Sequence, residues 1–153
     1  MKLELKHLAP YLPYLLTIRV YRANESLFVE DLVLNGEILD YLFENSHQRN
    51  NSMNIYKPIL RPLSDITKEI EVNGERFIPA AKLKSMVYEF DNIKISFVIV
   101  DGIGGRYIAW QANNDRTNRP VPYQFYEKLY EWHFDIFGLI DAGLAVDINT
   151  VKF

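Results

Sequence analysis

The sequence predicts an α+β fold, in which strands and helices follow one another without a regular alternation. Three observations lead to this prediction. Short β-rich segments fill the first third of the chain, a second pair covers residues 93–111, and a long amphipathic stretch begins at residue 122. We therefore expect a small N-terminal antiparallel sheet, open or closed into a barrel, a further β-hairpin, and a long aromatic-rich C-terminal helix.

The N-terminal segment favours a short helical turn followed by a strand. Leucines between residues 5 and 12 have helical spacing, but Pro10 and Pro13 each remove a backbone donor and limit the length of any helix. Residues 17–22 then alternate apolar and polar side chains and are rich in β-formers. This pattern predicts a half-buried strand.

Residues 27–43 are predicted to form a β-hairpin. Two apolar segments flank Asn35 and Gly36, and Asn-Gly is the strongest short signal for a two-residue hairpin turn, because both positions favour positive φ. The polar segment 44–54 then predicts a loop. Residues 55–60 are apolar and extended in character, and they predict a further strand.

Two short helices and a second hairpin are expected in the middle of the chain. The first helix runs from Ser64 to the Asn73-Gly74 pair, which we expect to end it. Pro79 suits the first position of the second helix, where its missing N–H is not needed. Residues 93–111 form two strands around a glycine-rich turn, which is typical of a hairpin, since a phosphate-binding loop would lead into a helix.

The last predicted helix covers residues 122–142. Apolar and aromatic residues recur at spacings of three and four around most of its circumference, which indicates burial on more than one side. Such a helix either lies centrally in the domain or supplies an oligomer contact. Tyr130, Phe134 and Phe137 form its second apolar stripe, and we expect them to contact a partner.

The length of 153 residues fits one domain. The polar segment at 44–54 divides this domain into two candidate subdomains. Residues 1–62 are mostly β, and residues 63–153 are mixed α and β. Neither half clearly owns a separate core, so we predict a single α+β domain over residues 1–153.

Composition and charge exclude several classes of protein. The chain is 48% hydrophobic and 24% charged, as globular proteins are. It contains no cysteine, which rules out disulfides, thiolate nucleophiles and cysteine-ligated metals. The N-terminus lacks the apolar core of a signal peptide, and no apolar run reaches the length of a membrane span. We therefore expect a soluble cytoplasmic protein that does not bind membranes.

No cofactor-binding, metal-binding or catalytic motif is found in the sequence. His7, His47 and His133 show no metal-ligand spacing, and His133 lies within the apolar stripe of the last predicted helix. We expect His133 to be a core histidine. The prediction is a non-enzymatic protein without cofactor or metal, with an active site assembled from distant residues as a remaining alternative.

A cluster of arginine and aromatic residues supports a second functional hypothesis. Arginines next to stacking aromatics are typical of sites that bind single-stranded nucleic acid. The cluster consists of Arg106, Tyr107, Trp110, Arg116 and Arg119. The formal net charge of −3 argues against it, because nucleic-acid affinity comes mainly from clustered cations. Nucleic-acid binding is therefore the alternative and not the leading hypothesis.

Three stretches carry a resemblance to a known group of proteins. They are residues 7–14 (HLAPYLPY), 56–65 (YKPILRPLSD) and 131–140 (EWHFDIFGLI). In this order they resemble small proteins, without assigned activity, from phage and prophage regions of gut-dwelling anaerobic bacteria. The resemblance implies a phage-encoded protein in the cytoplasm of the bacterial host and transfers no functional residue. Together with the aromatic surplus, it leads us to predict a protein-binding or assembly module that contacts a protein partner or itself.

Overall fold

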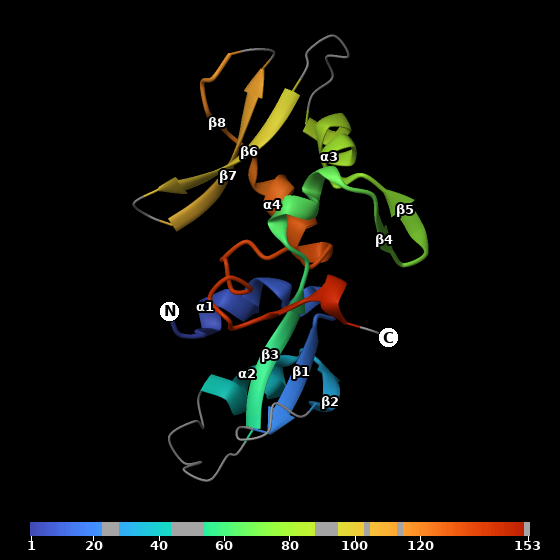
Figure 1. Ribbon diagram of the computed structural model, residues 1–153, viewed down its shortest axis with the longest axis vertical. Helices are drawn as coiled ribbons and strands as arrows, with labels where there is room; N and C mark the ends of the chain where they lie inside the picture. Colours follow the sequence, from blue (N-terminus) through green and yellow to red (C-terminus); the bar gives the residue numbers. More distant parts are fainter. Residues whose placement is uncertain (23–27, 44–53, 88–94, 103–104, 113–114, 152–153) are drawn as a thin grey trace.

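The computed structural model describes residues 1–22, 28–43, 54–87, 95–102, 105–112 and 115–151. These residues form an α+β fold with a four-stranded sheet, a three-stranded sheet and a separate two-stranded hairpin. Figure 1 shows an elongated molecule with two lobes. The described residues within 1–60 and 139–151 form the first lobe, and those within 63–136 form the second lobe.

A helical segment opens the first lobe. Helix α1 (Leu5–Leu8) continues into the 3-10 helix η1 (Ala9–Tyr14), which confirms the predicted short helical turn. Pro13 lies inside η1, where the chain is already too tightly wound for a regular α-helix. Leu15 ends the segment in a left-handed conformation with φ of 54°. Tyr11 is fully buried beneath it.

The four-stranded sheet of the first lobe has the order β2-β1-β3-β9. Its strands are β1 (Thr17–Arg22), β2 (Phe28–Val33), β3 (Asn54–Leu60) and β9 (Val146–Asp147). β1 lies antiparallel to β2 and β3, whereas β9 runs parallel to the end of β3. Within the described residues the sheet is open, with β2 and β9 at its edges, so it does not close into a barrel. The predicted loop at 44–54 falls outside the described residues except for Asn54, which begins β3.

Helix α2 (Gly36–Phe43) replaces the second strand of the hairpin predicted over residues 27–43. Asn35 begins this helix instead of a turn, because its side-chain Oδ1 accepts a hydrogen bond from the backbone N–H of Ile38 at 2.9 Å. The hairpin prediction was wrong because an Asn-Gly pair suits a helix start as well as a tight turn. The helix buries Leu39 in the first core and packs Leu42 and Phe43 against the same core. In a strand, Leu42 and Phe43 would point to opposite faces.

The second Asn-Gly pair forms the hairpin that the first does not. Strands β4 (Ile70–Val72) and β5 (Glu75–Phe77) pair antiparallel around Asn73 and Gly74, whose φ angles are 52° and 82°. Positive φ at both central residues is what a two-residue hairpin turn requires. The helix expected to end here is reduced to the 3-10 helix η3 (Leu63–Thr67).

The second lobe packs two helices against the three-stranded sheet (Figure 1). Helix α3 (Pro79–Val87) begins at the predicted proline. Strands β6 (Ile95–Gly102) and β7 (Gly105–Ala112) pair in register along their full lengths, which confirms the predicted hairpin. The short strand β8 (Arg119–Pro120) extends the sheet on the other side of β7.

The last helix is much shorter than the predicted 122–142. Helix α4 spans Tyr123–Glu131. The backbone N–H groups of His133 and Phe134 return to carbonyls of the last helical turn at 3.0 and 2.9 Å, and His133 takes the left-handed φ of 59°. This is a Schellman-type helix end with histidine where glycine is usual.

The chain beyond α4 crosses back to the first lobe. The backbone N–H of Arg61 donates to the carbonyl of His133, and the N–H of Asp135 donates to the carbonyl of Arg61, both at 2.8 Å. The carboxylate of Asp135 then accepts the backbone N–H groups of Leu139 and Ile140 at 2.9 and 2.8 Å. The spacing that predicted a longer helix therefore belongs to a turn whose apolar residues enter two different cores.

Two hydrophobic cores lie on either side of this crossing. The first contains Leu8, Tyr11, Leu16, Ile18, Leu34, Leu39, Leu60, Leu139 and Ala145. The second contains Leu63, Ile66, Ile70, Leu83, Ile108, Phe125, Leu129, Trp132, Phe134 and Ile136. Because Leu139 and Ala145 complete the first core, the chain does not divide into self-contained halves at residue 62.

Candidate functional site

The three aromatic residues predicted to contact a partner lie at the junction of the two lobes. Phe134 is 0% exposed and belongs to the second core, so that part of the prediction was wrong. Tyr130 and Phe137 are half-buried and pack against both cores, with nearly parallel rings 6.4 Å apart. The ring of Tyr11 meets Tyr130 edge-on at 5.1 Å. These residues join the lobes to each other.

The predicted arginine and aromatic cluster is divided by the geometry of β7. Side chains alternate along a strand, so Arg106 and Trp110 lie on one face and Tyr107 on the other. The guanidinium of Arg106 lies between two carboxylates, 3.1 Å from Asp101 and 3.6 Å from Asp141. These two carboxylates offset the charge of this cation and so weaken its attraction for a phosphate.

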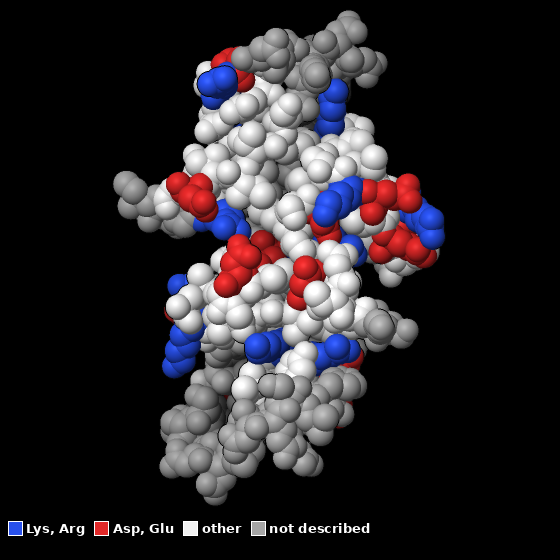
Figure 2. Space-filling model, in the orientation of Figure 1, with Lys and Arg blue, Asp and Glu red and all other residues white. Residues whose placement is uncertain are grey.

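The remaining arginines of the cluster lie beyond β7. Arg119 is 2.6 Å from the carboxylate of Asp115, and its guanidinium stacks 4.9 Å from the ring centroid of Trp110. Hydrogen bonds from Arg119 and Thr117 hold the pKa of Asp115 at about 2. Arg116 is exposed. Figure 2 shows the coloured cations beside acidic residues over much of the visible face, without a continuous basic surface.

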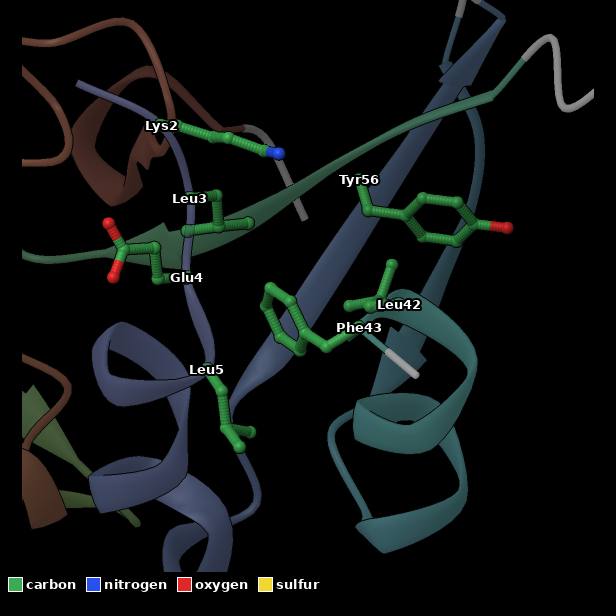
Figure 3. A pocket seen from close by; sticks show the side chains of 7 residues that line it. All are labelled: Lys2, Leu3, Glu4, Leu5, Leu42, Phe43 and Tyr56. Carbon is green, nitrogen blue, oxygen red and sulfur yellow. The ribbon is translucent and has the colours of Figure 1, made fainter. Parts of the chain in front are cut away.

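An apolar groove of about 580 Å³ opens in the first lobe (Figure 3). It lies between the segment that precedes α1, the end of α2, and β3. We call this site the groove. Its apolar walls are formed by Leu3, Leu5, Leu42, Phe43 and Tyr56. A concave, mostly apolar site of this size is the usual form of a binding site.

Three elements position the walls of the groove. The N-terminal segment supplies Leu3 from one side. The last turn of α2 places Leu42 and Phe43 on the opposite side, which a strand would have sent to opposite faces. β3 supplies Tyr56, whose ring meets Tyr41 of α2 edge-on at 5.6 Å. The helix that begins at the first Asn-Gly pair is therefore what forms the site.

The rim of the groove carries one positive charge over apolar walls. In Figure 3 the side chain of Lys2 extends along the groove towards Tyr56, while the carboxylate of Glu4 points away from it. Glu4 lies 3.0 Å from the ammonium group of Lys6, which lowers the pKa of Glu4. Leu5 is 48% exposed at the open side. The groove thus favours a ligand with apolar groups and an acidic one.

The groove was not found from the sequence because residues 37–43 were assigned to a strand. In a helix, Leu39, Leu42 and Phe43 have the spacing i, i+3, i+4 and share one face. Leu39 is buried in the first core, and Leu42 and Phe43 are half-buried beside it and line the groove. That spacing is the signal that would have indicated the site.

A smaller hollow of about 160 Å³ lies at the junction of the lobes, beside Ser64, Arg106, Asp135 and Asp141. Its charged groups are already engaged. Both carboxylate oxygens of Asp135 accept backbone N–H groups, and Arg106 pairs with Asp141. This arrangement stabilises a turn and offers no group poised for acid–base chemistry.

The two histidines in the described ranges make structural hydrogen bonds. His7 accepts the backbone N–H of Glu4 on Nδ1 at 3.0 Å, and the Nε2 of His133 lies 2.6 Å from the carbonyl of Tyr14. Because a carbonyl only accepts, Nε2 of His133 carries the proton. Burial lowers the pKa of both imidazoles. His133 is thus a half-buried histidine with its hydrogen bond satisfied within the fold, as predicted, and His47 lies outside the described residues.

The described residues show no metal-binding cluster and no membrane-spanning helix. Among the described side chains, no three His, Asp or Glu residues converge as metal ligands. None of the described helices has the length and apolar content needed to span a bilayer. No family model, curated protein or solved structure matches the chain.

Proposed function

We propose that the protein is a non-enzymatic protein-binding or assembly module, and that its partner binds in the groove. The observation that supports this proposal is the groove itself, about 580 Å³ in volume and walled by leucine and aromatic side chains. Apolar side chains in a concave site release water when a partner covers them. Half-buried aromatic residues such as Phe43 and Tyr56 are the usual anchors of protein interfaces.

The sequence predicts partner contacts at the aromatic stripe of Tyr130, Phe134 and Phe137, whereas we propose the groove as the binding site. Tyr130 and Phe137 are occupied in joining the lobes, whereas Leu5 at the groove is 48% exposed. Removing a central interface anchor typically weakens binding by roughly 2 kcal/mol or more. Phe43 is the residue of the groove from which we expect a loss of this size.

We also propose that the protein is phage-encoded and acts in the cytoplasm of a bacterial host. The support is the resemblance of residues 7–14, 56–65 and 131–140 to phage and prophage proteins. These three stretches meet at the junction of the lobes, where Tyr11 donates to the carbonyl of Phe134. The resemblance therefore concerns mainly residues that build the fold, and Tyr56 is the one residue of these stretches that also lines the groove.

A capture experiment with a matched pair of variants tests the binding function. The tagged protein is incubated with nuclease-treated bacterial host lysate, and bound proteins are identified by mass spectrometry. We expect a stoichiometric partner that is lost with Leu5→Glu and retained with Val33→Glu. Both residues are about half exposed, and Val33 lies on β2 outside the groove, so the two variants carry the same charge change. A partner retained equally by both variants would place binding elsewhere.

Nucleic-acid binding is the second candidate, supported by the stack of Arg119 on Trp110 and by Tyr107, which is 41% exposed. The test is fluorescence anisotropy with labelled single-stranded DNA and RNA at increasing salt concentrations. Affinity that falls steeply with salt and with Trp110→Ala would favour this function over the first. Partners captured only from lysate without nuclease treatment would point the same way.

A further inference from the structure

One backbone hydrogen bond just before β1 shows which residues of β1 bond to β2 and which bond to β3. The backbone N–H of Leu34 donates to the carbonyl of Leu16 at 2.7 Å, in line with the β1–β2 register. This makes Leu16 and Leu34 a hydrogen-bonded antiparallel pair. Ile18 and Val20 therefore bond to β2, and Arg19 between them bonds to β3; the β1–β2 register shifts only after Val20.

The same alternation places the backbone of Tyr56 on the outer edge of β3. Lys57 and Ile55 pair with β1, so the N–H and C=O of Tyr56 point away from β1. Pro58 faces the same edge, where its lack of an N–H loses no ladder bond. β9 pairs only with the last two residues of β3. Among the described residues, this edge has no strand partner at Tyr56.

Edge and groove meet at this one residue, because the side chain of Tyr56 lines the groove while its backbone groups lie on the open edge. An unpaired strand edge is a template for another strand, and proteins use such edges to bind extended peptides. Main-chain hydrogen bonds then supply affinity, and a neighbouring pocket for alternate side chains supplies specificity.

We infer that the groove binds an extended peptide segment of a partner, which adds to the outer edge of β3 as a strand in line with β9. This inference rests on the proposed function and names the class of partner. Alternate residues of the peptide place apolar side chains between Leu3 and Phe43. An acidic residue of the peptide lies beside Lys2, the cation at the rim, since Glu4 is paired with Lys6.

Selection from a random peptide library tests the inference without knowledge of the partner. A library of twelve-residue peptides displayed on phage is selected on the full chain, and binders that also bind the Leu5→Glu variant are discarded. We expect the enriched peptides to carry apolar residues at i and i+2 next to an acidic residue. A peptide binding as a helix would carry them at i, i+3 and i+4 instead.

N-methylation then separates strand addition from side-chain binding alone. The best peptide is synthesised with single N-methyl groups at successive backbone amides, and each affinity is measured by fluorescence anisotropy. We expect methylation at every second amide to weaken binding about tenfold and methylation between them to change it less than about twofold. Lys2→Gln should weaken binding about threefold and reduce its salt dependence. Val33→Glu should leave the affinity unchanged.

The outcomes distinguish the inference from the function on which it rests. Helical spacing in the enriched peptides, or equal losses at both sets of amides, would overturn strand addition and leave the groove as a protein-binding site. An absence of peptides that depend on Leu5 would also overturn the inference. Equal retention of the captured partner by Leu5→Glu and Val33→Glu would instead remove the proposed function, because the partner would then bind outside the groove.

Discussion

Replacing Tyr11 with phenylalanine removes a single oxygen atom from the junction between the lobes. The Tyr11 hydroxyl donates to the backbone carbonyl of Phe134 at 2.5 Å and accepts the N–H of Ile136 at 3.5 Å. Tyr11 is 0% exposed, so water does not replace the lost group. Phenylalanine keeps the edge contact with the ring of Tyr130, so the substitution isolates the hydrogen bonds.

We expect Tyr11→Phe to lower the free energy of unfolding by about 2 kcal/mol. A buried carbonyl left without a donor costs about 1–3 kcal/mol. The second hydrogen bond is long and adds little. In a chain of this length, a loss of about 2 kcal/mol lowers the Tm by about 4–8 °C. Urea unfolding at pH 7, followed by circular dichroism, measures the change, with Tyr123→Phe at a 70% exposed site as the control.

Alkaline pH provides a second readout of the same hydroxyl. Burial raises the pKa of Tyr11 well above its ordinary value of 10.0. The folded protein therefore keeps this proton above pH 10 while the unfolded chain releases it, and stability falls as pH rises. The fall should be smaller in Tyr11→Phe. Unfolding free energies within about 0.5 kcal/mol of wild type at pH 7, and an unchanged alkaline slope, would refute the role assigned to this side chain.

Three further perturbations test other parts of the structure, each measured by urea or thermal unfolding. Stability should fall as pH drops below about 6.5, because burial lowers the pKa of His133 and the unfolded chain takes up a proton that the folded protein excludes; His133→Asn, which tolerates the positive φ, should flatten this slope. Asn35→Ala should cost about 1 kcal/mol by removing the N-cap of α2, and Asn35→Ser should retain most of that stability. Gly138→Ala should cost about 1 kcal/mol because φ is 74° and not because of crowding, as the nearest atom to the added Cβ is 3.7 Å away. Gly36→Ala, at a helical position with nothing within 4 Å, should not destabilise, and an equal loss at both glycines would contradict the strain argument.

The two Asn-Gly pairs show how far local sequence determines local structure here. Both are flanked by apolar segments, and within four residues they look alike. At Asn73 both turn residues take positive φ, whereas at Asn35 the side chain caps a helix. The difference arises from tertiary packing, because the segment after Asn35 buries Leu39 in a core that distant residues complete. Strand β1, in which apolar and polar side chains alternate, could be predicted without such information.

The end of α4 could not be predicted from the sequence, because apolar residues continue past it for a different structural reason. Up to Leu129 the apolar spacing belongs to a helix that packs in the second core. From Phe134 to Leu139 a similar spacing belongs to a turn between two cores. No glycine or proline lies at the end of the helix. His133 itself adopts the left-handed conformation there, and its hydrogen bond to the carbonyl of Tyr14 holds it in place.

The candidate site was the part least accessible from sequence. Residue type alone indicated cations at Arg106 and Arg119, but it did not show that carboxylates already lie within hydrogen-bonding distance of both. The groove depends on assigning α2 correctly and on the meeting of three separate segments. Neither requirement is met by spacing within a single element.

The crossing of the chain back to the first lobe has a consequence for synthesis on the ribosome. Leu60 emerges early, but Leu139 and Ala145 of the same core, and strand β9, are made only after the entire second lobe. At about 5–20 residues per second, the interval lasts roughly 4–16 s. During that time the second lobe can collapse while the first still exposes apolar surface. A stalled or truncated chain would therefore contain every described residue that lines the groove but lack the part of the first core that Leu139 and Ala145 supply.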